Sequence, residues 1–254
     1  MSLESESKAV EILGLRERKK RRTREAIAEA AVGLFLKHGF DQVSVSHVAA
    51  AADVSKVTVF NYFPTKEDLV LSRIAYQVDL PAHVVRSRAE GETPLQALQR
   101  DYLRRLAERD PSTGTCADEH VLAIQRMILA SPALTMRMTH HMLSSEESLC
   151  AALDEEIGES MNGVVARVTA AQFLATERAL ADRNLHRLLN GIDPDRLYLD
   201  AVAEADLAYG VLARGVASTG CRWGAPAEAR IAGPRESRLA EARLADPRLA
   251  EFRN

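Results

Sequence analysis

The chain has 254 residues, of which 46% are hydrophobic and 27% charged, a composition that is ordinary for a soluble globular protein. This length allows a sizeable core and one to two domains. No apolar run approaches the length of a membrane span and no hydrophobic signal segment opens the chain, so we expect a cytoplasmic protein without a membrane partner. Its three cysteines (Cys116, Cys150 and Cys221) are far apart and form no C-x-x-C pair, which favours reduced thiols over a structural zinc site.

Positive charge is concentrated near the N-terminus. The net charge of the chain is −3, which argues against indiscriminate coating of nucleic acid. Residues 16–66 nevertheless carry ten Lys/Arg against five Asp/Glu, so the remainder sums to about −8. Residues 1–15 show no clear period and are expected to be a mobile tail. The basic run that follows is either a solvated charge run or, as we expect, part of an N-terminal arm over residues 1–20 that contacts DNA.

A first helix is predicted from about Thr23 to His38. Gly39 would end this helix in the left-handed conformation, and Phe40 can then fold back onto its apolar face. That face consists of Ile27, Ala31, Leu34 and Phe35.

Two short helices with a tight turn between them are predicted next. Ser44 is the N-cap of the first and Ser55 the N-cap of the second, and Asp53-Val54 interrupts the apolar pattern between them. The inner face of the first helix is Val45, Val48, Ala49 and Ala52. In the second, which we expect to end at Phe63, Val59, Phe60 and Phe63 can pack inward, while Lys56, Thr58, Asn61 and Tyr62 face outward. A short helix that presents such polar groups suits the major groove of DNA.

Pro64 should end the second short helix, and Thr65 with Asp68 predicts a capping box for a fourth helix. Lys66 would lie in its first turn, where the backbone N–H groups already favour an anion, so it is a candidate phosphate ligand. The inner face of this helix is expected to be Leu69, Val70, Ile74 and Val78.

The rest of the chain is also predicted to be helical. The expected helices cover about 93–109, 118–130, 132–157, 164–189 and 193–217, with a loop at 110–114 and a break at 158–163. The last two carry apolar stripes, one of Leu174, Ala181, Leu185 and Leu188, the other of Leu197, Ala201, Ala205, Ala208 and Leu212. These stripes either form ordinary core or dock against a second copy as an intermolecular four-helix bundle. Residues 218–254 are interpreted as a variable tail.

The segment from about Thr23 to Ile74 resembles the N-terminal domain of the tetracycline-repressor (TetR/AcrR) family of bacterial transcription regulators. The resemblance lies in the Gly-aromatic pair after the first helix, the hydroxyl-Val pair that opens the second, Val-Ser-Lys before the third and Tyr-Phe-Pro-Thr-Lys-Glu after it. It implies an all-α fold with a three-helix helix-turn-helix DNA-binding domain over residues 21–80. A larger helical ligand-binding and dimerisation domain would follow over residues 81–217.

Carried onto this chain, the resemblance implies that Ser44, Ser46, Tyr62 and Lys66 contact the DNA backbone. Residues of the third helix would face the groove, and these roles differ because phosphate contacts position a protein whereas base contacts specify sequence. The full set of predicted DNA-binding residues is Arg22, Ser44, Ser46, Ser55, Lys56, Val57, Thr58, Asn61, Tyr62 and Lys66. The chain departs from the family pattern at Asp53, where glycine is common, at Val57, and at Phe60, which lacks the hydroxyl of the usual tyrosine.

The leading hypothesis is a dimeric repressor that a small-molecule effector releases from a palindromic operator, with no enzymatic activity and no cofactor. An activator or a ligand-independent regulator is an alternative. A metal-dependent enzyme is a further alternative, because Cys116 and His120 have the i, i+4 spacing of metal ligands and His140-His141 follow, although the pattern favours helix caps and ordinary histidines. Ordinary core packing is also favoured for the residues that could line an apolar effector cavity, namely Met127, Met136, Met138, Met142 and Phe173.

Overall fold

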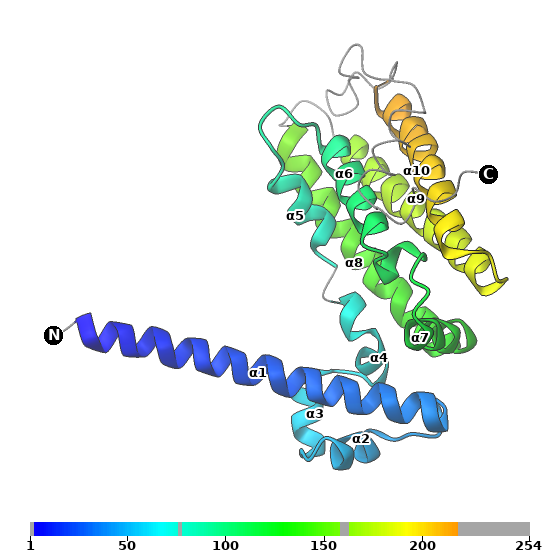
Figure 1. Ribbon diagram of the computed structural model, residues 1–254. Helices are drawn as coiled ribbons and strands as arrows, with labels where there is room; N and C mark the ends of the chain where they lie inside the picture. The colour runs from blue at the N-terminus through cyan, green and yellow to red at the C-terminus, as the bar shows by residue number, and fades with distance from the viewer. Residues whose placement is uncertain (1–2, 76–77, 158–162, 218–254) are drawn as a thin grey trace. The chain divides into compact units, whose positions relative to one another are not determined.

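The computed structural model describes residues 3–75, 78–157 and 163–217, and within these ranges the chain is helical without any strand (Figure 1). The helices are α1 (Leu3–His38), α2 (Val45–Ala51), α3 (Lys56–Tyr62), α4 (Lys66–Ala75), α5 (Leu80–Arg86), α6 (Pro94–Ala107), the 3-10 turn η1 (Pro111–Thr113), α7 (Glu119–Ala130), α8 (Pro132–Ile157), α9 (Val164–Leu189) and α10 (Pro194–Ala217). The predicted all-α fold is confirmed. None of the helices in the described part of the chain is long and apolar enough to cross a membrane. The expected tail at 218–254 lies outside the described residues.

The chain forms two compact units. Of the described residues, the first unit contains 3–75 and 123–141, and the second contains 78–122, 142–157 and 163–217. Helix α8 therefore supplies its first residues to the first unit and its later residues to the second.

Helix α1 is longer than the sequence predicted. It begins at Leu3, so the basic run belongs to a helix and the expectation of a mobile tail over residues 1–15 is wrong. The predicted inner face is confirmed, since Ile27, Ala31 and Phe35 are almost completely buried. Gly39 has a left-handed φ of 86° and lets the chain reverse, and Phe40 returns to lie 5.1 Å from Phe35 between ring centroids.

The helix-turn-helix pair α2 and α3 packs on this α1 face through Val48, Ala49, Val59 and Phe63, all of which are buried. Phe60, however, is 42% exposed, so the prediction that it packs inward is wrong. The reason is helical geometry: Val59 and Phe63 share one face at i, i+4, and Phe60 lies about 100° further round the helix.

Between these helices the chain turns at Asp53, which has a φ of 52°. Aspartate is among the few residues other than glycine that adopt this left-handed conformation. The turn between α2 and α3 therefore forms without a glycine at this position.

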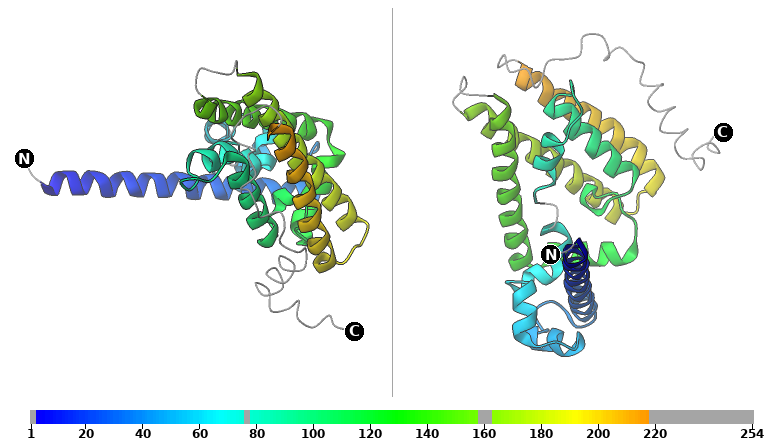
Figure 2. Two further views of the ribbon diagram at one scale, coloured as in Figure 1. Left: turned by 90° about the horizontal axis from the view of Figure 1, so that it is seen from above. Right: turned by 90° about the vertical axis from the view of Figure 1, so that its left-hand side faces the viewer.

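The second unit is built around α6, α9 and α10. In Figure 2, α9 and α10 lie side by side, and α6 packs against α10. Their shared core contains a cluster of aromatic rings, in which Tyr209 lies 5.8 Å from Tyr102 and 6.1 Å from Phe173 between centroids. The predicted bounds of α8, α9 and α10 are confirmed, as are the Thr93 N-cap and Pro94 at the start of α6.

Polar groups inside the second unit are paired across helices. The buried Arg105 donates to Asp101 at 2.9 Å and to Glu177 at 2.5 Å, and the Tyr209 hydroxyl donates to the same Glu177 carboxylate at 3.1 Å. At η1, Gly114 adopts a φ of 73° directly against the backbone of α9. The neighbouring Thr113 carbonyl accepts a buried hydrogen bond of 2.9 Å from Asn184.

Candidate nucleic-acid interface

The start of α2 presents two exposed hydroxyl groups, on Ser44 and Ser46. Ser44 is the N-cap, as predicted: its Oγ accepts the backbone N–H of His47 at 3.3 Å. His47 completes a capping box by accepting the Ser44 N–H at 3.4 Å, a role that sequence reasoning missed because this position is usually Glu or Gln. The Ser44 hydroxyl acts here as an acceptor, so its hydrogen can still be donated to a phosphate oxygen.

The start of α3 carries a second pair of hydroxyl groups. Ser55 Oγ accepts the Thr58 backbone N–H at 2.9 Å and lies 2.8 Å from Thr58 Oγ1. One hydroxyl hydrogen is used between the two side chains, and the other remains to be donated. Ser55 is therefore both the N-cap that begins α3 and a group that can bind DNA.

The outer face of α3 consists of Lys56, Val57, Phe60 and Asn61, all exposed. Val57 is 69% exposed, although it is apolar and contributes nothing to the core. Lys56 Nζ lies 5.9 Å from the centre of the Phe60 ring. The two side chains, four residues apart on α3, therefore form a cation–π contact on its exposed face. This face combines a cation, an amide and an apolar branch, which are the groups that read base edges in a major groove.

Tyr62 and Arg22 flank this face differently from what the sequence suggested. The Tyr62 ring packs against the first-unit core, so the prediction that it faces outward is wrong for the ring, and the residue stays only partly exposed. Arg22 is exposed on α1 as part of a helix. Its neighbour Arg24 instead packs over Phe63, with 4.9 Å between the guanidinium carbon and the ring centroid.

Helix α4 begins with the predicted capping box. Thr65 donates its N–H to Asp68 Oδ2 at 3.1 Å, and Asp68 donates its N–H to Thr65 Oγ1 at 3.2 Å. Lys66, the first residue of α4, is half-buried, and its Nζ lies 4.3 Å from the centre of the Phe40 ring. The ammonium group is therefore positioned by cation–π contact with Phe40, and Lys66 itself belongs to the first turn of α4, where the helix dipole favours an anion.

The Asp68 carboxylate is buried and also contacts two residues of α8, Arg137 and His141, neither of which the sequence indicated as its partner. Arg137 donates from Nε to Oδ1 at 2.8 Å and from Nη2 to Oδ2 at 3.0 Å, and His141 Nε2 lies 3.3 Å from Oδ1. Burial alone would raise the pKa of Asp68, but the hydrogen bonds from Arg137 and Thr65 outweigh it and hold the pKa below its usual value. The pKa of His141 is lowered, because burial and the charge of Arg137 disfavour the imidazolium.

The other candidate sites are not assembled. Within residues 3–75, 78–157 and 163–217, no group of three or more His, Cys, Asp or Glu side chains could hold a metal ion. The suggested effector-cavity residues belong to different units, since Met127 and Met138 pack on the first core while Phe173 is buried in the second. Met136 is 75% exposed.

The geometry defines a helix-turn-helix unit with a polar recognition helix between two capped helix N-termini. Residues 27–72 of this unit match the family described as bacterial regulatory proteins, tetR family. This N-terminal segment is therefore similar to the DNA-binding domain of TetR-family regulators.

Individual members of that family show more limited similarity. The chain is 30% identical over 160 residues to the HTH-type transcriptional regulator TcmR of Streptomyces glaucescens, which covers 63% of this chain and 64% of TcmR, somewhat less than two thirds of that relative. It is 27% identical over 199 residues to the HTH-type transcriptional repressor KstR of Mycolicibacterium smegmatis, covering 76% and 87% of the two chains. The crystal structure of NalD, the secondary repressor of the MexAB-OprM multidrug efflux pump of Pseudomonas aeruginosa, aligns with a TM-score of 0.47 at 21% identity, over 78% of this chain and 97% of NalD.

Proposed function

We propose that the protein is a dimeric transcriptional repressor that binds a palindromic DNA operator and is released by a small molecule. The observation that carries the proposal is the exposed face of α3, where Lys56, Val57 and Asn61 stand outward while Val59 and Phe63 anchor the helix in the core. The match of residues 27–72 to the tetR family of bacterial regulatory proteins and the similarity to a repressor, KstR, support the same function.

Within this proposal the DNA contacts divide into two kinds. Ser44, Ser46 and Lys66 would bind phosphate oxygens at the N-termini of α2 and α4 and so fix the position of the unit on DNA. Lys56, Val57 and Asn61 would meet base edges, with Val57 placed to contact a thymine methyl group. Of the remaining predicted ligands, Ser55 and Thr58 would face the groove from the start of α3, and Arg22 and Tyr62 would add contacts to the DNA backbone.

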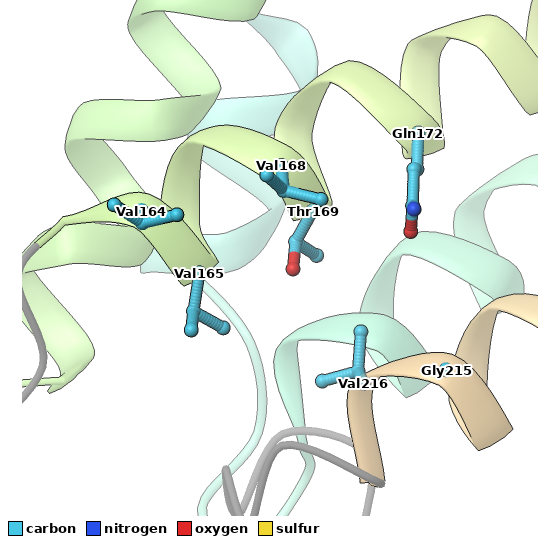
Figure 3. Close-up of a pocket in the computed structure, with 7 residues that line it drawn as sticks. All are labelled: Val164, Val165, Val168, Thr169, Gln172, Gly215 and Val216. Atoms are coloured by element: carbon cyan, nitrogen blue, oxygen red, sulfur yellow. The ribbon is translucent and has the colours of Figure 1, made fainter.

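Dimerisation is proposed through α9 and α10. These helices expose Val164, Val168, Leu207 and Val211, which are 47–66% accessible to solvent. A largely apolar groove of about 240 Å³ adjoins them, lined by Val164, Val165, Val168, Thr169, Gln172, Gly215 and Val216 (Figure 3). An apolar surface of this kind on two long helices suits the same surface of a second copy, which would give a four-helix interface and two DNA-binding units for a palindrome.

The effector would bind the second unit. It can lower DNA affinity only if it binds one arrangement of the protein more tightly than the other. A compound handled by proteins encoded beside this gene is the first to test, and release would appear as a rise in the operator Kd when the compound is added.

Fluorescence anisotropy with the DNA upstream of the protein's own coding sequence tests the DNA-binding claim. We expect sequence-selective binding that weakens steeply with salt, and a loss of affinity in Lys56→Ala but not in Arg196→Ala, an exposed α10 variant with the same charge change. Equal binding to upstream and scrambled duplexes would rule the function out.

A further inference from the structure

The N-terminus of α4 combines groups that attract a phosphate with groups that repel one. Lys66 and the positive end of the α4 dipole favour an anion. Glu67 and Asp68 lie in the same turn, and two carboxylates there would oppose a phosphate oxygen. The charge of Asp68 must therefore be balanced if DNA is to approach this end of α4.

Arg137 supplies that balance with a bidentate contact. Its guanidinium meets both Asp68 oxygens, at 2.8 and 3.0 Å, in the fork geometry that gives the strongest arginine–carboxylate pairs. Asp68 is only 7% exposed as a side chain, so its charge is poorly screened by water and the arginine is its main compensation. His141 stands one turn further along α8, on the same face, and approaches the same oxygen at 3.3 Å.

The same carboxylate determines the geometry of the phosphate site. Asp68 Oδ2 accepts the Thr65 N–H and so closes the capping box around Lys66. A carboxylate held by a fixed arginine fork cannot rotate away from Thr65, and the first turn of α4 is fixed with it. Arg137 itself stands on α8, the helix that also supplies the buried Leu149 and Leu153 to the second-unit core.

We propose that Arg137 is a positioning residue for operator DNA: through Asp68 it neutralises and fixes the N-terminus of α4, so that Lys66 and the backbone N–H groups can bind a phosphate. The proposal rests on the proposed DNA-binding function. Arg137 acts through Asp68 and needs no DNA contact of its own.

The test measures the operator Kd of the full chain over a series of salt concentrations for wild type, Arg137→Gln, Arg137→Lys and the double variant Asp68→Asn with Arg137→Gln. We expect Arg137→Gln to bind on the order of tenfold more weakly, because the buried Asp68 carboxylate then carries an uncompensated negative charge in the first turn of α4 and its hold on Thr65 is loosened. Arg137→Lys should fall between it and wild type, since it keeps the charge and loses the fork. The double variant should recover much of the affinity, because the uncompensated charge is gone.

Two controls separate this role from a loss of folding. Arg100→Gln breaks the ion pair of the exposed Arg100 with Glu92 in the second unit and should leave DNA binding unchanged. In DNA-free protein, NMR titration should show a higher pKa for His141 in Arg137→Gln, because the charge of Arg137 helps to lower it.

The outcomes are distinct. If wild type shows no selective DNA binding, the proposed function fails. If wild type binds and folded Arg137→Gln binds within twofold of it with the same salt dependence, the role of Arg137 is refuted. Should Arg137→Gln not fold, Arg137→Lys replaces it: a Kd a few-fold weaker than that of wild type supports the positioning role, and a Kd equal to that of wild type overturns it.

Discussion

Replacing Gly114 with alanine would place a methyl group against the backbone of α9. The added Cβ would lie 2.2 Å from the Ala181 carbonyl oxygen and 2.9 Å from the Leu185 nitrogen, both of which belong to a regular helix and cannot rotate away. The φ of 73° adds a cost of about 1–2 kcal/mol for any residue with a Cβ. To relieve the clash the loop must leave α9, and the buried hydrogen bond between Asn184 and Thr113 is then lost, which costs about 1–3 kcal/mol more.

Gly191 provides the matched control. It has a similar φ of 81°, yet a Cβ there would meet nothing within 4 Å. Gly191→Ala should therefore cost only the backbone term of about 1–2 kcal/mol, whereas Gly114→Ala should cost about 2–5 kcal/mol, the sum of the two terms. Urea unfolding followed by circular dichroism, at one protein concentration, gives both free energies. If the two variants lose the same stability, the close packing of the loop on α9 is not as described.

Three further changes test other parts of the structure. Lys66→Gln should weaken binding to all DNA sequences alike and make the slope of log Kd against log salt shallower by about 1, measured by anisotropy; an unchanged slope would contradict a phosphate contact. Because Arg137 and Thr65 hold the pKa of Asp68 below its usual value against burial, its ionised form contributes stability that is present above the unfolded pKa and is lost as pH falls through the folded pKa. In Asp68→Asn the free energy of unfolding, measured by urea unfolding at each pH, should therefore decrease less below about pH 4 than it does in wild type. The same pH dependence in both proteins would show that Asp68 is not the titrating group. Val211→Glu should convert a dimer to a monomer in sedimentation velocity by placing charge on the exposed face of α10; a wild-type monomer would exclude the proposed interface.

The sequence predicted those parts of the fold that apolar periodicity and capping residues report. The buried faces of Ile27, Ala31 and Phe35 and of Val48 and Ala49 follow their spacing, since a helix that packs on a core must repeat its apolar residues. The sequence did not predict the N-terminal part of α1, which begins at Leu3, because that part has no repeating apolar stripe. Apolar periodicity detects the buried face of a helix, and a helix without such a face gives no signal.

The sequence predicted only those interactions of the candidate site that join residues close together in the chain. Ser44, Ser55 and the Thr65–Asp68 box act within one helical turn, so residue type and spacing revealed them. Arg137 meets Asp68 across 69 residues, and nothing in a single sequence indicates which carboxylate a distant arginine will find. Phe60 was placed inward because it is aromatic, whereas its position on α3 puts it beside Lys56.

Selection of bound duplexes from a random DNA pool by the full chain tests the central claim most directly. We predict enrichment of one sequence with two half-sites related by inversion, because two identical helix-turn-helix units in a symmetric dimer read the same bases in opposite directions. The Lys56→Ala variant should retain weak binding but lose enrichment at the positions that Lys56 reads. A pool that remains random after selection with the wild-type chain would contradict the account.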